Sequence, residues 1–121
     1  MKKSYIIKGI LSVFALAALI FILALGVNHF RWASQGFDSI QQMEAEIAIR
    51  ESWIEQGDNV LINEQIIEMF RYHIRQTRSA AHENISWGVG LLLSMLPIIG
   101  LNVYIWLEPV VKGRKPVEQN I

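Results

Sequence analysis

Two long stretches without charged residues dominate the hydropathy pattern of the chain. They cover residues 9–27 (GILSVFALAALIFILALGV) and 85–107 (ISWGVGLLLSMLPIIGLNVYIWL), and neither contains Asp, Glu, Lys, Arg or His. At a helical rise of ~1.5 Å per residue they reach about 28 Å and about 34 Å, close to the ~30 Å thickness of a hydrocarbon core. The pattern therefore predicts two transmembrane helices.

The first stretch has an alternative interpretation as a cleavable signal peptide. It follows a basic start, and Ala24 and Gly26 fit the −3 and −1 positions of a cleavage site. The run is, however, longer than the usual h-region of ~7–15 residues. We therefore favour an uncleaved helix.

Residues 28–84 separate the two stretches and carry apolar residues at helical spacing. Asp38 is a candidate N-cap for a first arm, and Gly36 makes residues 28–37 a candidate irregular segment. Gly57 is the expected C′ residue of this arm, with Asp58 or Asn59 capping the next helix. The residues expected at an interface between the arms or with a partner are Ile40, Met43, Ile47, Trp53, Ile54, Ile67, Phe70 and Ile74, with Arg50 at a seam position among them.

The second arm is expected to continue into the second transmembrane helix, because residues 60–87 contain no proline or glycine. Its stripe comprises Val60, Ile67, Phe70, Ile74, Thr77, Ala81, Asn84, Gly88, Leu91 and Met95. The fold class is an all-α membrane protein, with two transmembrane helices joined by an antiparallel helical-hairpin ectodomain. Its expected parts are a tail (1–8), helix 1 (9–27), the hairpin (28–84, turning near 57–59), helix 2 (85–107) and a second tail (108–121).

An antiparallel arrangement about Gly57 also predicts ion pairs between the arms. The expected pairs are Glu44 with Arg71, Asp38 with Arg78, and Arg50 with Glu64 or Glu68. Exposed pairs contribute only about 0–1 kcal/mol each, so their main effect is to favour one register. A second expectation concerns apolar residues that one arm cannot cover, namely Trp53, Ile54, Ile62, Ile66 and Met69. They favour a homodimer with a four-helix bundle, or docking on a larger membrane protein.

Composition and charge add an orientation. Charged residues make up 18% of the 121 residues, below the soluble average of ~25%, and the zero net charge gives no indication of nucleic-acid binding. The absence of cysteine excludes disulfides and thiolate chemistry. The cationic flanks of the apolar stretches are Lys2, Lys3 and Lys8 before the first, and Lys112, Arg114 and Lys115 after the second. The positive-inside rule predicts cytoplasmic termini and a periplasmic or extracellular hairpin, in a plasma membrane such as the bacterial inner membrane.

Small residues recur along the second apolar stretch. Ser86, Gly90 and Ser94 lie four apart, and Asn102 follows on the same expected face. This spacing allows close approach of membrane helices, either the first helix of the same chain or a helix of another protein. Pro97 removes a backbone donor in mid-stretch and Gly100 adds pliability. These two residues are therefore a candidate hinge, with a static bend as the commoner case.

Two further groups of residues are candidates for ligand binding. His29 and His82 both lie about one turn outside the apolar stretches, and two imidazoles are a minimal candidate for a metal or haem site. Because no further ligand accompanies them, we expect no metal and no cofactor. Arg71, Arg75 and Arg78 form a basic stripe that suits an anionic ligand or lipid headgroups, with pairing to the acidic arm as the alternative.

No motif for nucleotide binding, acyl transfer or zinc-dependent hydrolysis occurs, so we do not expect an enzyme. The order of helix, outer helices and helix resembles in topology the sensory half of chemoreceptors and histidine kinases, although the 14 residues after Leu107 are too few for a HAMP or kinase module. We expect an integral membrane protein that acts through protein contacts, as an accessory, assembly or regulatory subunit or as a self-associating scaffold. Its partners would be the lipid bilayer and a second copy or a larger membrane protein, without nucleic acid. The alternatives are a small homo-oligomeric channel or holin-like pore, and a minimal ligand sensor with a four-helix-bundle ectodomain.

Overall fold

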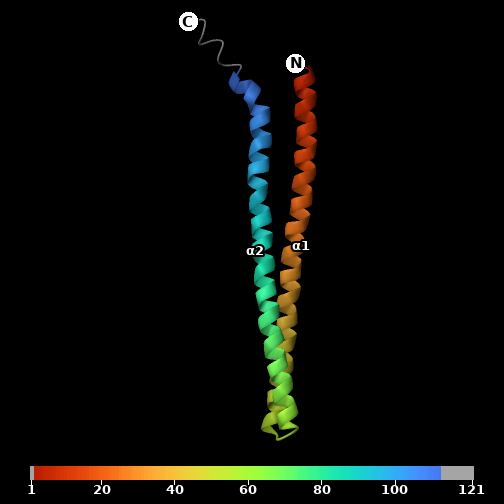
Figure 1. The fold of residues 1–121 in the computed structure, drawn as a ribbon, viewed down its shortest axis with the longest axis vertical. Coiled ribbons are helices and arrows are strands. Elements are labelled where there is room, and N and C mark those ends of the chain that lie inside the picture. Colours follow the sequence, from red (N-terminus) through yellow and green to blue (C-terminus); the bar gives the residue numbers. More distant parts are fainter. Residues whose placement is uncertain (1, 113–121) are drawn as a thin grey trace. The chain divides into compact units, whose positions relative to one another are not determined.

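Two helices and one tight turn make up the described part of the chain. The computed structural model describes the backbone of residues 2–112 and the side chains of residues 3–108. Helix α1 spans Lys2–Glu55 and helix α2 spans Val60–Lys112, and residues 56–59 join them (Figure 1). Both helices are long and apolar enough to cross a membrane. Arg114 and Lys115, which belong to the predicted C-terminal cationic flank, lie outside the described residues.

The turn ends α1 with a Schellman motif. The N–H of Gly57 donates to the carbonyl of Ile54 (2.9 Å), and the N–H of Asp58 donates to the carbonyl of Trp53 (3.0 Å). Gly57 has a φ of 81°, in the left-handed region that glycine reaches without a Cβ clash. The carbonyl of Asn59 then accepts the N–H of Asn63 at 2.9 Å, which begins α2. The chain therefore reverses at the glycine that the sequence marks as the C′ residue.

Alternating three- and four-residue steps mark the contact between the two helices, which we call the seam. The buried side chains on it are Ala33, Ile40, Asn63, Ile67, Ile74 and Ala81. This alternation is the heptad repeat of a coiled coil, here between antiparallel helices. The seam positions are residues 12, 15, 19, 22, 26, 29, 33, 36, 40, 43, 47, 50 and 54 of α1, and residues 63, 67, 70, 74, 77, 81, 84, 88, 91, 95, 98, 102 and 105 of α2.

The chain divides into two compact units. The polar unit comprises residues 27–88, and the apolar unit comprises the residues up to Gly26 and from Val89 onwards. In the polar unit the seam is the core. In the apolar unit most large side chains are exposed, with Phe14 at 70% and Phe21 at 65%. Only 6% of the most apolar window of each helix is buried, unlike the core helix of a soluble protein.

Three local expectations about the arms are wrong. Residues 28–37 are helical, and Asp38 lies inside α1 and does not cap a helix. The helix continues because Gly36 sits on the seam, where an added Cβ would lie 3.4 Å from the Cβ of Ala81, so packing offsets the glycine penalty of ~1 kcal/mol. Val60 is exposed, because it lies at the turn beyond the last seam layer, and Asn63 takes the seam position expected for it.

The predicted ion pairs are also wrong, although the antiparallel arrangement is right. Arg78 pairs with Glu44 (3.6 Å), and Arg71 pairs with Glu51 (3.3 Å) and, within α2, with Glu68 (3.9 Å). Arg50 lies 4.0 Å from Glu46 of its own helix and does not reach Glu64 or Glu68. Side chains on an α-helix lean towards its N-terminus. In antiparallel helices two long side chains therefore meet diagonally, not at the level of their Cα atoms.

Candidate interaction surface

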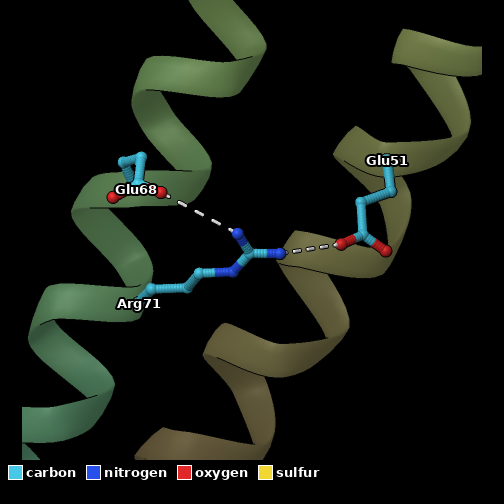
Figure 2. Close-up of polar contacts among 3 residues, drawn as sticks. All are labelled: Glu51, Glu68 and Arg71. Carbon is cyan, nitrogen blue, oxygen red and sulfur yellow. Dashed lines mark hydrogen bonds and ion pairs between the residues drawn. The ribbon is translucent and has the colours of Figure 1, made fainter.

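The two flanks of the seam differ in chemistry. One, which we call the charged flank, carries Glu51, Glu64, Glu68 and Arg71 around the seam residues Ile54 and Ile67. Figure 2 shows Arg71 of α2 between Glu51 of α1 and Glu68 of its own helix. These side chains are half-exposed or more, so each pair contributes at most about 1 kcal/mol.

The predicted arginine stripe lies on this charged flank. Arg71 and Arg78 are both ion-paired with the acidic residues of α1. Arg75, one turn from each, makes no ion pair within the described residues. Two of the three guanidinium groups are therefore already engaged within the hairpin.

The opposite flank carries large apolar side chains, and we call it the apolar flank. Trp53 and Ile62 lie on it together, because both line a groove beside the seam residues Arg50 and Asn63. Ile66 and Met69 follow Ile62 at steps of four and three, which places them on the same side of α2. Ile49 precedes Trp53 by one turn of α1. Ile62 is 57% exposed and Met69 is 51% exposed, so the polar unit leaves this surface uncovered.

A second groove continues the apolar flank along α1. Ser39, Ala45 and Glu46 line it with Ile49, and Met43 and Phe70 contribute from the seam. The small side chains of Ser39 and Ala45 leave a hollow beside the bulky residues nearer the turn. The flank thus has both ridges and a groove, as surfaces that receive another helix have.

A polar layer closes the seam next to the turn. Asn63 is only 4% exposed, accepts a hydrogen bond from Nη1 of Arg50 (3.0 Å) and donates to the carbonyl of Asp58 (2.9 Å). The Arg50 guanidinium lies 5.6 Å from the Trp53 ring centre and 6.0 Å from that of Phe70, within cation–π range. Arg50 Nε is buried without a hydrogen-bond partner. This layer ties the turn to the arms and presents Trp53 on the apolar flank.

His29 and His82 have separate partners. Nδ1 of His29 lies 2.9 Å from Oδ1 of Asn84, and its ring contacts Trp32 edge-on and stacks on Trp87. His82 meets the ring of Phe37 edge-on, at 5.8 Å between centres. No group of three His, Cys, Asp or Glu side chains with the geometry to hold a metal lies within the described residues. His29 therefore forms a polar seam layer with Asn84.

The apolar unit contains a polar contact of its own. Nε1 of Trp106 donates to Oγ of Ser12 (2.7 Å), and that hydroxyl donates to Oδ1 of Asn102 (2.8 Å). Asn102 thus bonds across the seam to α1. A hydrogen-bonded chain of this kind favours one register of two apolar helices, since the alternative registers leave an amide unpaired.

The other residues of the predicted small-residue face point elsewhere. Ser86, Gly90 and Ser94 are exposed, off the seam. Oγ of Ser94 donates to the carbonyl of Leu91 in its own helix (2.6 Å), and an added Cβ on Gly90 would meet open space. A step of four residues drifts across the seven-residue repeat, so these three residues and Asn102 do not share one contact. α2 remains helical through the candidate hinge residues Pro97 and Gly100.

Several residues that make contacts across the seam were not predicted from the sequence. Asn63 and Ser12 are polar and so escape a search for apolar periodicity, although both fall in phase with the heptad. Phe30 lies against Gly88, where an added Cβ would be 2.9 Å from its ring. Counting strict three-and-four steps outwards from Ile67 and Ile40 would have placed Asn63 on the seam and separated the two flanks.

No family model, no curated protein and no solved structure matches this chain.

Proposed function

We propose that the protein is an integral membrane protein that acts by binding other proteins through its polar unit. The two apolar stretches anchor it in a plasma membrane such as the bacterial inner membrane, both termini are cytoplasmic, and residues 28–84 project outside. In this role it is an accessory, assembly or regulatory subunit of a membrane complex, or a scaffold. The observation that carries the proposal is the combination of an apolar unit that leaves its side chains uncovered and a polar unit with one uncovered apolar flank.

The exposed apolar surface supports the membrane anchor. Phe14, Phe21, Leu96 and Leu101 are more than 60% exposed, although they are among the most apolar residues of the chain. In water each such side chain costs about 1.5–3 kcal/mol relative to burial, whereas hydrocarbon tails cover it without cost. The Trp106–Ser12–Asn102 contact supports the same location, since it pairs polar groups inside an otherwise apolar unit.

The polar unit supports a binding role. Its heptad seam holds two arms in a fixed register, and its charged flank is engaged in internal ion pairs. Its apolar flank, with Trp53, Ile62 and Met69, is the surface left for a partner. Aromatic and methionine side chains of this kind are enriched in protein interfaces.

Single cysteines test the location cleanly, because the chain has none of its own. Gln56→Cys at the turn should react with a membrane-impermeant maleimide in cells whose inner membrane is intact. Ser4→Cys should react only after the inner membrane is disrupted. The reverse pattern, or a purified chain that stays in solution without detergent, would overturn the proposal.

A native mass measurement in gentle detergent tests the binding role. The expected species contain more than one polypeptide, either several copies of this chain or one larger partner at fixed stoichiometry. Ile62→Lys on the apolar flank should shift the population to single chains, and Glu68→Lys on the charged flank should not. Single chains throughout for the unaltered protein would contradict the proposal.

The alternative functions gain less from the structure. A pore lined by Ser94 and Asn102 requires both to face one lumen, whereas Asn102 bonds Ser12 on the seam and Ser94 bonds its own helix. A sensor built on the arginine stripe requires free guanidinium groups, and Arg71 and Arg78 are ion-paired.

A further inference from the structure

We propose that the apolar flank is a self-association surface, on which a second copy of the chain packs about a two-fold axis parallel to α1 and α2 of the polar unit. The product is a four-helix bundle made of two hairpins. The inference rests on the proposed function, because anchoring in one membrane holds both copies in the same orientation. A two-fold axis along the helices is the symmetry that keeps this orientation and joins a surface to itself.

A rotation about this axis leaves the position of every residue along the axis unchanged, so equivalent residues of the two copies lie at the same height. It brings α1 of one copy against α2 of the other, since the axis passes in front of the apolar flank. Trp53 and Ile62 lie at one height, beside the same Arg50–Asn63 layer. Trp53 therefore faces the partner's Ile62. Ile49 lies one helical turn further from residues 56–59 and comes level with the partner's Ile66. Large apolar side chains thus meet large apolar side chains in both halves of the contact.

Polar residues continue the flank beyond these apolar pairs. Gln42 and Glu46 continue the row of Ile49 on α1, and His73 and Gln76 continue the row of Met69 on α2. At the same offset along the helices, Glu46 of one copy comes level with the partner's Met69, and Gln42 comes level with the partner's His73. The self-complementary part of the flank is therefore its apolar part, and an isologous interface requires a surface that matches itself.

The shape of the flank agrees with a second copy. The groove beside Ser39 and Ala45 is open, and the partner's α2 presents the row of Ile66, Met69 and His73 to fill it. The four residues Ile49, Trp53, Ile62 and Met69 are each between 41% and 57% exposed, so each has apolar surface to bury in the contact. A standard interface buries ~800 Å² per partner, so the proposed contact includes the polar residues around them.

Crosslinking of single-cysteine variants in the membrane tests the proposal with the full chain. Residue 66 lies beside the two-fold axis, so Ile66→Cys should give a covalent dimer with a short bismaleimide. Glu68→Cys is the matched control, two residues away on the charged flank, and should give at least tenfold less dimer. Equal crosslinking at both positions, or crosslinking at residue 68 only, overturns the proposal.

A dissociation measurement separates the self-association from the proposed function. Förster transfer between labelled copies in liposomes should report dimers, and Ile62→Lys should raise the dissociation constant at least tenfold while Glu68→Lys leaves it unchanged. Helicity by circular dichroism confirms that both variants fold. If Ile66→Cys instead crosslinks to a different protein and not to a second copy, self-association is wrong and the binding function stands. If the turn lies in the cytosol, the proposed function itself fails.

Discussion

At the scale of single residues, polar and small side chains on the seam decide how the two arms fit. Asn63 joins three segments, because it accepts from Arg50 of α1 and donates to the carbonyl of Asp58 in the turn. Gly88 and Gly36 allow close approach, since a Cβ at either would touch the opposite helix. Buried polar groups are costly when unpaired, so they specify a register more sharply than aliphatic residues do.

Removing the Asn63 side chain should destabilise the polar unit. Asn63→Ala leaves the Arg50 guanidinium without its cross-helix acceptor and the Asp58 carbonyl without its donor, at a cost of about 1–3 kcal/mol. Thermal unfolding of the full chain in detergent measures the loss. Gln65→Ala, an exposed position two residues away, serves as the control and should leave the midpoint nearly unchanged. Equal unfolding midpoints for the two variants would show that the Arg50–Asn63 layer contributes nothing to the stability of the polar unit.

Two glycines two residues apart should respond oppositely to alanine. At Gly88 the new Cβ lies 2.9 Å from the Phe30 ring, whereas at Gly90 it meets open space. Gly88→Ala should therefore be less stable than Gly90→Ala by about 1–3 kcal/mol, the usual cost of overpacking. Denaturant unfolding compares the pair. Phe30→Leu in the Gly88→Ala background should recover part of the loss, and a failure to recover would assign the effect to something other than this contact.

At the scale of elements, each helix is one unbroken segment with a seven-residue repeat. α1 runs from Lys2 to Glu55 through Gly36, and α2 from Val60 to Lys112 through Pro97. The continuity of α2 could be predicted from the absence of helix breakers in residues 60–87. The continuity of α1 could not, because the local signals at Gly36 and Asp38 favour a break, and packing against Ala81 outweighs them.

The contact between Ser12 and Asn102 should be measurable as a coupling energy. A double-mutant cycle of Ser12→Ala and Asn102→Ala should give about 0.5–2 kcal/mol, the range for hydrogen bonds between membrane helices. Unfolding in mixed micelles provides the free energies. Ser94→Ala paired with Asn102→Ala is the control and should show no coupling, because the Ser94 hydroxyl bonds its own helix. Coupling in both cycles would contradict a specific hydrogen bond between Ser12 and Asn102.

At the scale of the whole molecule, the distribution of residues around the seam separates two flanks with different chemistry. The charged flank holds the ion pairs between the two helices, and the apolar flank leaves large side chains exposed. The heptad phase that produces this division is present in the sequence, and strict counting recovers it. Which cation meets which carboxylate is not recoverable in this way, because Glu44–Arg78 and Glu51–Arg71 depend on the lean of side chains on two opposed helices.

Deleting one heptad from each arm at the same level should preserve the register of α1 against α2. Deleting a heptad from one arm alone should destroy that register. A Cβ added at position 36 would lie 3.4 Å from the Cβ of Ala81, so Gly36→Cys with Ala81→Cys should form a disulfide. Deletion of residues 40–46 together with 69–75 removes one heptad from each arm and should retain this disulfide. Deletion of residues 40–46 alone shifts position 36 by about 10 Å along the seam and should abolish it. A disulfide in all three proteins would mean that the seam does not set the register.

The sequence by itself determined the features that depend on residues near one another along the chain. These are the two apolar stretches, the reversal at Gly57 and the heptad phase of each arm, because helix length, turn conformation and amphipathic faces follow from local spacing. Only the tertiary structure decided which residues meet across the seam: Ser12 with Asn102, His29 with Asn84, and Arg50 with Asn63. These partners are set by the axial offset of two packed helices and by the direction in which their side chains lean, and neither quantity is encoded in the spacing along one helix.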